Sequence, residues 1–214
     1  MELIFNITEP QHKNRLTGKV HNAKEYINLK LSLMEILMSF WTGNPAHART
    51  PYVCIKQEGD LKRAFIVCQD KISSFGFEYH IRTNNRDFTF RPNNIVEFNY
   101  GTTAINARAI SEAKTIYQTY STREENTYCY TILDVDETIC DEAFILFESM
   151  FFMEPGYIRY DHDINRTDPI LHPLDHFDVN YSKFVHYKLG LPIRITRDEF
   201  LDILDKNTRC HTLG

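Results

Sequence analysis

The apolar residues of this chain change their spacing along the sequence, and this change constrains the fold more than any other feature. Over residues 23–41 they recur every three or four positions, as on one face of an α-helix, and Asn22 stands where it can cap the start. From Tyr52 onward apolar and polar residues alternate, as in a half-buried β-strand. Separate stretches with these two periods predict an α+β fold, with antiparallel sheets packed with about four helices.

Turn and cap residues divide the chain into further elements. The Glu58-Gly59-Asp60 turn separates two alternating runs, 52–57 and 61–69, and predicts a β-hairpin. Thr196-Arg197-Asp198-Glu199 is a capping box that predicts the start of a last helix. The same reasoning predicts a second hairpin from 75–82 and 88–91, helices at 104–120 and 141–153, and strands at 128–135, 157–160, 177–180 and 184–189.

The length of 214 residues fits one domain. We therefore expect a single α+β domain over residues 1–214. The charged stretch at 121–126 is the best place for a subdivision, into an N-terminal helix with a meander (1–122) and a C-terminal β-rich module (127–214).

Composition places the chain among ordinary globular proteins, with 43% hydrophobic and 25% charged residues. The formal charge of −5 argues against a wholly basic surface but allows a local basic patch. Five scattered cysteines without a C-x-x-C pair indicate reduced thiols. No apolar run approaches the length of a membrane span and the N-terminus does not resemble a signal peptide, so we expect a cytoplasmic protein without a membrane partner.

Residues 133–141, LDVDETICD, resemble the first motif of haloacid dehalogenase-type phosphatases, D-x-D-x-T at the end of an apolar strand. The resemblance implies that Asp134 attacks phosphorus, that Asp136 acts as acid and base, and that Mg²⁺ neutralises the oxygens. The roughly 80 residues that follow contain no paired acidic motif at a strand end to hold the metal. The same residues also fit a structural interpretation, in which a strand is followed by a helix that begins with acidic residues, as the helix dipole favours.

A dense group of titratable side chains lies at residues 157–181, YIRYDHDINRTDPILHPLDHFDVNY. Carboxylates with imidazoles are a typical ligand set for divalent metals such as Zn²⁺, Mn²⁺ or Mg²⁺, and they also serve acid and base chemistry near neutral pH. On a strand, Arg159 and Asp161 would share one face, joined by Asp163 if the strand continues. We therefore predict four metal ligands, Asp161, Asp163, His172 and His176, and four catalytic residues, Arg159, Asp161, His172 and His176.

The same group also has a structural interpretation, which the sequence leaves open. Arg159 would pair with Asp161 or Asp175, and the histidines would satisfy backbone groups and pin a loop against the sheet. We expect His162 and His186 at the surface rather than as ligands. The basic residues that follow suit either a phosphate contact or a solvated strand face: Lys183, Lys188, Arg194 and Arg197.

The C-terminal quarter, residues 157–204, also resembles a bacterial family classed as a domain of unknown function. The order RYDHD, HPLDH, a strand hairpin and P-x-x-I-T-x-x-E-F-L-D-I-L is similar to that family's R-[FY]-D-x-D and H-P-x-x-H signature with its apolar terminal helix. Members occur beside helicase genes in phage-defence loci, so the resemblance implies a helicase or ATPase partner. It maps onto Arg159, Asp161, Asp163, His172, Pro173 and His176.

Our first functional hypothesis is a cytoplasmic bacterial accessory protein of an anti-phage defence system, which acts on nucleic acid with a helicase or ATPase partner. The alternative is a metal-dependent, nuclease-like hydrolase that uses the C-terminal Asp/His cluster. A D-x-D-x-T phosphatase and a binding module without chemistry complete the set. No G-x-G-x-x-G, Walker A or nucleophile-elbow pattern occurs, so nucleotide-driven and serine-hydrolase readings have no support.

Overall fold

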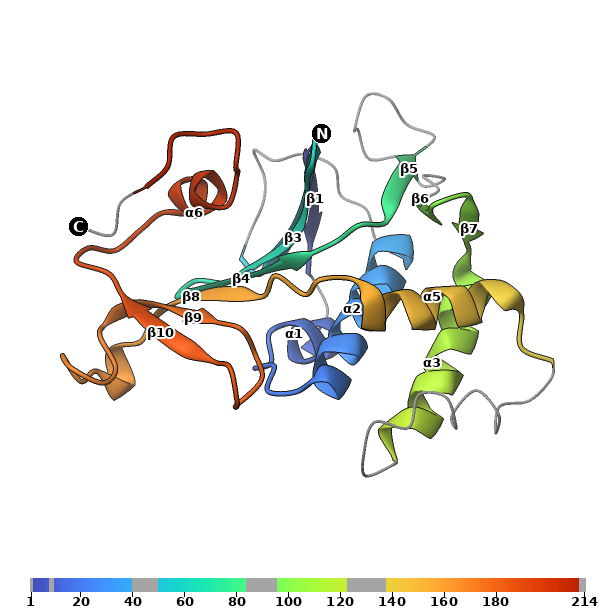
Figure 1. The fold of residues 1–214 in the computed structure, drawn as a ribbon, viewed down its shortest axis with the longest axis horizontal. Coiled ribbons are helices and arrows are strands. Elements are labelled where there is room, and N and C mark those ends of the chain that lie inside the picture. The colour runs from blue at the N-terminus through green and yellow to red at the C-terminus, as the bar shows by residue number, and fades with distance from the viewer. Residues whose placement is uncertain (1, 8–9, 40–49, 84–95, 123–137, 212–214) are drawn as a thin grey trace. The chain divides into compact units, whose positions relative to one another are not determined.

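The structure is a computed structural model that describes residues 2–7, 10–39, 50–83, 96–122 and 138–211. These residues form five α-helices and two antiparallel sheets, so the predicted α+β class is confirmed (Figure 1). The chain folds into two compact units, each built from separate stretches of sequence. We call residues 1–7, 45–77 and 155–214 the sheet unit, and residues 8–44 and 78–154 the helical unit. This division falls at other points in the sequence than the charged stretch at 121–126.

The sheet unit contains an antiparallel sheet of seven strands in the order β1-β2-β3-β4-β8-β9-β10. Strands from the two ends of the sequence meet in its middle, where β4 pairs with β8 and Ser73 lies opposite Arg159. The unit also holds the short 3₁₀ helix η2 and the last helix α6. The bounds are β1 Glu2–Asn6, β2 Tyr52–Glu58, β3 Leu61–Val67, β4 Lys71–Gly76, β8 Ile158–His162, η2 Ile164–Arg166, β9 Asp175–Val179, β10 Tyr187–Gly190 and α6 Arg197–Ile203.

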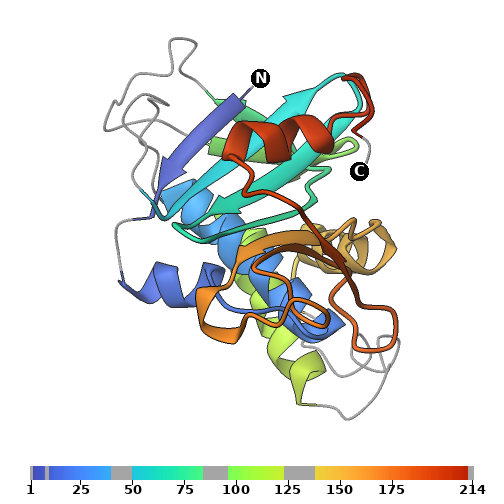
Figure 2. The ribbon, with the colours of Figure 1, turned by 90° about the vertical axis from the view of Figure 1, so that its left-hand side faces the viewer.

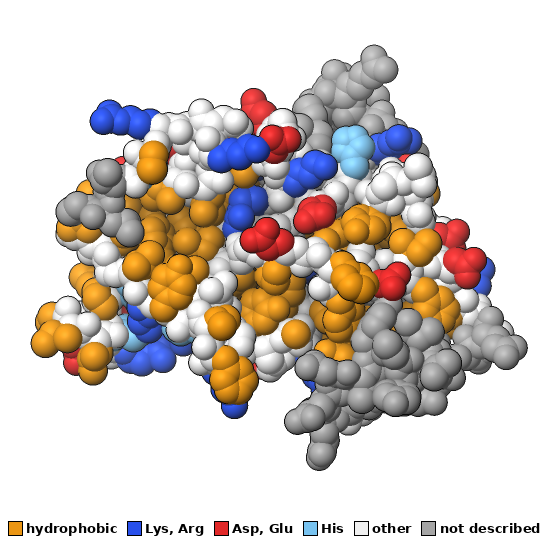
Figure 3. All heavy atoms as spheres, in the orientation of Figure 1, with side chains coloured by type: hydrophobic (Ala, Val, Ile, Leu, Met, Phe, Trp, Pro, Cys, Tyr) orange, Lys and Arg blue, Asp and Glu red, His pale blue; other side chains and the backbone are white. Residues whose placement is uncertain are grey.

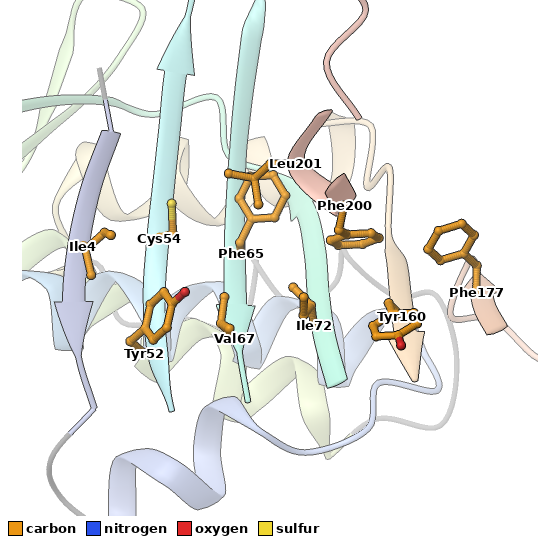
Figure 4. Packing of buried hydrophobic residues seen from close by; sticks show 10 residues of the cluster. All are labelled: Ile4, Tyr52, Cys54, Phe65, Val67, Ile72, Tyr160, Phe177, Phe200 and Leu201. Atoms are coloured by element: carbon orange, nitrogen blue, oxygen red, sulfur yellow. The ribbon is translucent and has the colours of Figure 1, made fainter. Parts of the chain in front are cut away.

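The helix α6 covers one face of this sheet, as Figure 2 shows. The Phe200 ring is fully buried, with its centroid 5.6 Å from that of Phe177 and 6.2 Å from that of Phe65. Alternate residues of the strands supply the rest of this core, because side chains two apart point to the same face. Figure 4 shows the ten residues of the cluster: Ile4, Tyr52, Cys54, Phe65, Val67, Ile72, Tyr160, Phe177, Phe200 and Leu201.

The described part of the helical unit combines four helices with a small antiparallel sheet in the order β5-β6-β7. Asn106 caps α3 with its side-chain oxygen, which accepts a hydrogen bond of 2.9 Å from the Ala109 amide. Glu112 on α3 accepts the Cys140 amide at 2.7 Å and thereby ties α3 to the start of α5. The bounds are α1 Pro10–Leu16, α2 Ala23–Ser39, β5 His80–Thr83, β6 Val96–Tyr100, β7 Thr103–Ile105, α3 Ala107–Ser121 and α5 Asp141–Phe152.

Several sequence predictions are confirmed in this fold. The hairpin of β2 and β3 turns at Gly59, whose φ of 56° is a conformation that glycine adopts without strain. Both hydrogen bonds of the predicted capping box are present between Thr196 and Glu199. Among the described residues, no helix has the length and apolar character needed to cross a lipid bilayer.

Other boundaries were wrong. The strand predicted at 75–82 is two strands in different sheets, since β4 ends at Gly76 and β5 begins at His80. The helix predicted from residue 104 begins at Ala107, because residues 103–105 pair in β7. The last strand begins at Tyr187 rather than at 184, because residues 182–186 form a turn in which the His186 amide donates to the Ser182 carbonyl.

Three predictions lie outside the described residues. These are the strands at 128–135 and 88–91, and the D-x-D-x-T motif with Asp134 and Asp136.

Candidate functional site

The face of the seven-stranded sheet opposite to that in Figure 4 changes from apolar to charged across its width. On β1, β2 and β3 it carries buried apolar side chains such as Leu3, Val53 and Ile66. The cross-strand register continues this face through one polar residue on each later strand: Ser73, Arg159, Asp178 and Lys188. We use the name charged cluster for Arg159, Asp161, His176, Asp178, His186 and Lys188. Charged groups that are buried need partners of opposite charge or hydrogen-bond partners, and these residues provide them for one another.

Arg159 joins the two carboxylates of the cluster. Its Nε lies 2.9 Å from both carboxylate oxygens of Asp161, its Nη2 lies 2.6 Å from Oδ2 of the same residue, and Nη2 also donates to Asp178. All three residues are buried. Burial alone would lower the pKa of Arg159, but the hydrogen bonds and charge of Asp161 outweigh it and raise that pKa. The prediction that Arg159 and Asp161 share one strand face is confirmed.

His176 is fully buried and held in one tautomer. Its Nδ1 lies 2.8 Å from the Pro173 carbonyl oxygen, which can only accept, so Nδ1 carries the hydrogen and Nε2 is the atom with a lone pair. Burial and then the positive charge of Lys188 lower the pKa of His176. At neutral pH the imidazole is therefore uncharged and offers Nε2 as a hydrogen-bond acceptor or a metal ligand.

Lys188 reaches the same two residues from β10. Its ammonium nitrogen lies 3.0 Å from Oδ1 of Asp178 and 3.1 Å from Nε2 of His176. His186 adds a donor, with Nε2 3.0 Å from the same Asp178 oxygen. Burial would raise the pKa of Asp178, but the hydrogen bond from Lys188 and the charge of Arg159 lower it well below its usual range. Two cations thus balance the two carboxylates of the cluster.

Asp161, His176 and Asp178 have the geometry and chemistry of a metal ligand set. One ligand atom from each lies within 4.8 Å of the other two, and His176 Nε2 is 3.8 Å from Asp161 Oδ2 and 3.9 Å from Asp178 Oδ1. A tetrahedral ion about 2.1 Å from each ligand would bring such atoms to about 3.4 Å, so the two distances from His176 would contract by about half an ångström and the two carboxylates would also move toward each other. Lys188 places its ammonium against two of the three ligands. The residues fit a divalent ion that displaces this ammonium.

Two of the four predicted metal ligands, Asp161 and His176, belong to this set, whereas Asp163 and His172 lie in the loop between β8 and β9. The strand β8 ends at His162, so Asp163 does not continue the row of Asp161 and instead caps η2 through the Asn165 amide. His172 forms an isolated β-bridge with Asp168, and its Nε2 lies 3.9 Å from Asp163 Oδ2.

The loop is nevertheless in contact with the cluster. The His172 and His176 rings meet edge to face with centroids 4.5 Å apart, and the buried Nδ1 of His172 has no hydrogen-bond partner among the described residues. Pro173 lies close over β10, where a Cβ on Gly190 would come within 3.0 Å of its ring. His172 therefore neighbours the ligand set and is a candidate for a supporting role.

Tyr160, His162 and Asp175 lie on the opposite face of the sheet. Asp175 accepts the Tyr160 hydroxyl and lies 2.8 Å from Nδ1 of His162. The alternation along β9 thus separates Asp175 from Asp178, although the two are close in sequence. His186 is exposed as expected, although its Nε2 also lies against the buried carboxylate of Asp178. His162, which we also expected at the surface, is largely buried and binds Asp175.

Sequence reasoning assigned no ligand or catalytic role to Asp178, Lys188 or His186. For Asp178 the signal was available, since it stands two positions after His176 and lies in the strand predicted at 177–180. Comparison with protein families, with characterised proteins and with solved structures found no match to this chain. The resemblance of residues 157–204 to a bacterial family therefore stays a prediction.

Proposed function

We propose that the protein is a metal-dependent hydrolase of phosphodiesters, a nuclease-like enzyme whose centre is the charged cluster. The observation that carries the proposal is the position of Lys188, whose ammonium lies between the lone pair of His176 and the carboxylate of Asp178. Asp161 Oδ2 lies 3.8 Å from the same His176 nitrogen. This is a cation position lined by one imidazole and two carboxylates, the donor set that Zn²⁺ and Mn²⁺ accept.

Each residue has a role in this reaction. Asp161, His176 and Asp178 would hold the ion, and Arg159 keeps both carboxylates in place through its hydrogen bonds. A bound divalent ion supplies Lewis-acid stabilisation of the phosphoryl oxygens and lowers the pKa of a bound water. Lys188, released from Asp178, has a flexible stem and binds a phosphate oxygen.

His186 completes the set of roles because its side chain is partly exposed at the edge of the cluster. In hydrolysis, a water molecule releases a proton to solvent and its oxygen bonds to phosphorus, while the ester P–O bond breaks and the leaving oxygen takes up a proton. His186 donates that proton as the general acid.

The charge balance of the cluster predicts how Lys188 affects the affinity for a metal ion. An ion at Asp161, His176 and Asp178 must displace Lys188, so this ammonium competes with the metal. Replacing Lys188 by methionine keeps the length of the side chain and removes the competitor. We expect Lys188→Met to bind Mn²⁺ more tightly than the wild type, by about tenfold or more, since a charge-assisted hydrogen bond contributes about 1.5 kcal/mol or more.

The experiment is calorimetric titration of the metal-stripped protein with Mn²⁺ and with Zn²⁺. Asp178→Asn is expected to lose binding, and Asp163→Asn is the matched control, because Asp163 is an acidic neighbour outside the ligand set. Equal affinity in wild type and Asp178→Asn would show that the ion binds elsewhere. No binding by either the wild type or Lys188→Met would refute the metal centre.

Activity is then measured on labelled single-stranded and duplex DNA and RNA with the metal that binds. The wild type is expected to cut, and Lys188→Met to bind metal but cut slowly, which separates the ligand role from the phosphate role. A metal-loaded wild type without any cleavage would refute the hydrolase function while leaving the metal site standing.

The accessory role with a helicase or ATPase partner in phage defence stays a prediction that rests on the sequence resemblance alone. A nuclease centre is compatible with that role, and capture of a helicase by the tagged chain in its own host would support it. The metal titration does not bear on it.

A further inference from the structure

Exposed apolar side chains are concentrated in the stretch of sequence that contains β9, β10 and the loops beside them. Among the described residues, nine large hydrophobic side chains are exposed, and eight of them lie between residues 164 and 193. Figure 3 shows hydrophobic and basic side chains next to one another along the lower left edge, over β10 and the loops beside β9 in Figure 1. Concentrations of this kind on a soluble surface mark binding sites more often than chance. The eight are Ile164, Ile170, Leu171, Leu174, Phe184, Val185, Tyr187 and Ile193.

The C-terminal part of this stretch contains basic but no acidic residues. Residues 179–197 contain four lysines and arginines and one histidine but no acidic residue, in a chain that has 29 acidic residues and a net charge of −5. Lys183 lies at the tip of this segment, in the turn between β9 and β10, with its ammonium 5.0 Å from the centroid of the Phe184 ring. Three of these basic side chains pair with carboxylates outside the segment: Lys188 with Asp178, Arg194 with Asp70 and Arg197 with Glu2. Among the described residues Lys183 has no such ion pair, so a ligand that matches the turn presents an anionic group beside a flat apolar group.

The β9–β10 turn holds Phe184 out into solvent, where its side chain is 84% exposed. The turn is ordered by its own hydrogen bonds: the His186 amide donates to Ser182 at 2.8 Å, and the Asn180 side chain donates to the Val185 carbonyl at 3.2 Å. Asn180 takes the left-handed conformation that starts the turn, with φ of 63°. An apolar ring on an ordered turn loses little entropy when a ligand stacks on it.

The turn is also joined directly to the charged cluster. His186, two residues after Phe184, places its Nε2 3.0 Å from Oδ1 of Asp178. Lys188 follows two residues later and reaches the same oxygen. The ring of Phe184 is therefore only two and four residues away from the two side chains that contact Asp178. A long ligand bound along this turn would extend into the proposed centre.

We propose that the β9–β10 turn binds single-stranded nucleic acid, with a base stacked on Phe184 and a backbone phosphate on Lys183. Single strands offer free base faces together with regularly spaced phosphates, which is the pairing of aromatic and basic groups that this turn presents. A duplex hides its base faces, so it binds less tightly here. The inference rests on the proposed function, which says that a phosphodiester bond is cut at the charged cluster. It adds that the substrate of that reaction is a single-stranded nucleic acid.

The experiment measures fluorescence anisotropy of a labelled oligothymidine of about 15 nucleotides, a length that covers one typical binding site, with the full chain at low salt in EDTA. Binding without metal keeps this result separate from the metal titration and from cleavage. We expect Phe184→Ala to weaken binding at least about fivefold. We expect Lys183→Gln to reduce the slope of log affinity against log salt by about 0.7, the value of one phosphate contact on a single strand.

Matched controls come from the same chain. Phe152→Ala removes another phenylalanine that is 74% exposed, on α5 in the helical unit, and Lys206→Gln removes another exposed lysine, which pairs with Asp60. Both are expected to bind the oligonucleotide like the wild type. Circular dichroism melting of each variant shows whether the fold is kept.

Three outcomes would overturn the inference. The first is absence of oligonucleotide binding by the wild type, and the second is equal loss in Phe184→Ala and Phe152→Ala. The third is a different occupant: Phe184-dependent dimerisation in sedimentation velocity, or Phe184-dependent binding to anionic phosphatidylserine vesicles without binding to DNA. If metal-dependent cleavage occurs without these binding effects, this inference fails and the proposed function stands. If single strands bind as expected but no metal ion binds, the proposed function fails and the binding of single strands stands.

Discussion

Lys30 on α2 allows a stability prediction that runs against the usual effect of core substitutions. The side chain is fully buried in the helical unit, where its ammonium lies 3.5 Å from the Met153 sulfur and 4.8 Å from the centroid of the Tyr26 ring. Burial lowers the pKa of Lys30 from 10.5 to about 8, with a smaller opposing effect of the Glu78 charge. At pH 7 the folded protein therefore carries a buried charge in a weakly polar environment.

The magnitude follows from the change in proton affinity. A tenfold change is worth about 1.4 kcal/mol, so the charged ammonium costs the folded state about 3 kcal/mol at pH 7 relative to the unfolded chain. Methionine has a similar length and no charge, but it gives up the interaction with the Tyr26 ring, which contributes about 1 to 2 kcal/mol when desolvated. We expect Lys30→Met to be more stable than the wild type at pH 7 by about 1 to 2 kcal/mol.

The pH dependence has a definite sign. Between about pH 8 and 10.5 the unfolded chain keeps the Lys30 proton and the folded protein loses it, so the free energy of unfolding of the wild type rises with pH across this window. The variant has no such rise, and its advantage over the wild type disappears as the pH approaches 10.5.

The assay is urea unfolding of the two proteins at pH 7 and at pH 10, with Lys13→Met, an exposed lysine on α1, as the control. The difference between Lys30→Met and wild type is expected to shrink or reverse at pH 10, while that of the control stays constant. A variant that is less stable than the wild type by the same amount at both pH values would refute the reasoning.

Two further predictions concern the sheet unit. Arg159→Met leaves Asp161 and Asp178 without their shared cation in a buried place, so we expect a loss of about 3 to 5 kcal/mol in chemical unfolding, more than Arg194→Met on the exposed ion pair with Asp70; equal losses would mean that the cluster is solvated. Thr196→Ala removes the capping box of α6 and is expected to cost about 1 kcal/mol, whereas Thr196→Ser retains most of it; a thermal melt of Thr196→Ala that equals the wild type would contradict this.

The local elements were predictable because their signals are local. A period of two or of 3.6 residues, a glycine in a turn and a Thr-x-x-Glu cap act over a few positions, and they located the β2–β3 hairpin, α5 and the start of α6. The shared face of Arg159 and Asp161 follows in the same way from strand alternation. The prediction of 75–82 as one strand failed because nothing local shows that the chain passes from one sheet to another between Gly76 and His80.

The composition of the charged cluster was decided by tertiary structure. Local alternation placed Arg159 beside Asp161, but only the antiparallel register sets Asp178 opposite Arg159 and Lys188 opposite Asp178. The pairing of β4 with β8 joins strands more than 80 residues apart, and no local pattern specifies such a partner. By itself the sequence determined which residue types were available for a site and which neighbours share a strand face. The register of β8, β9 and β10 decided which of them meet, because register depends on how distant hydrophobic faces pack together.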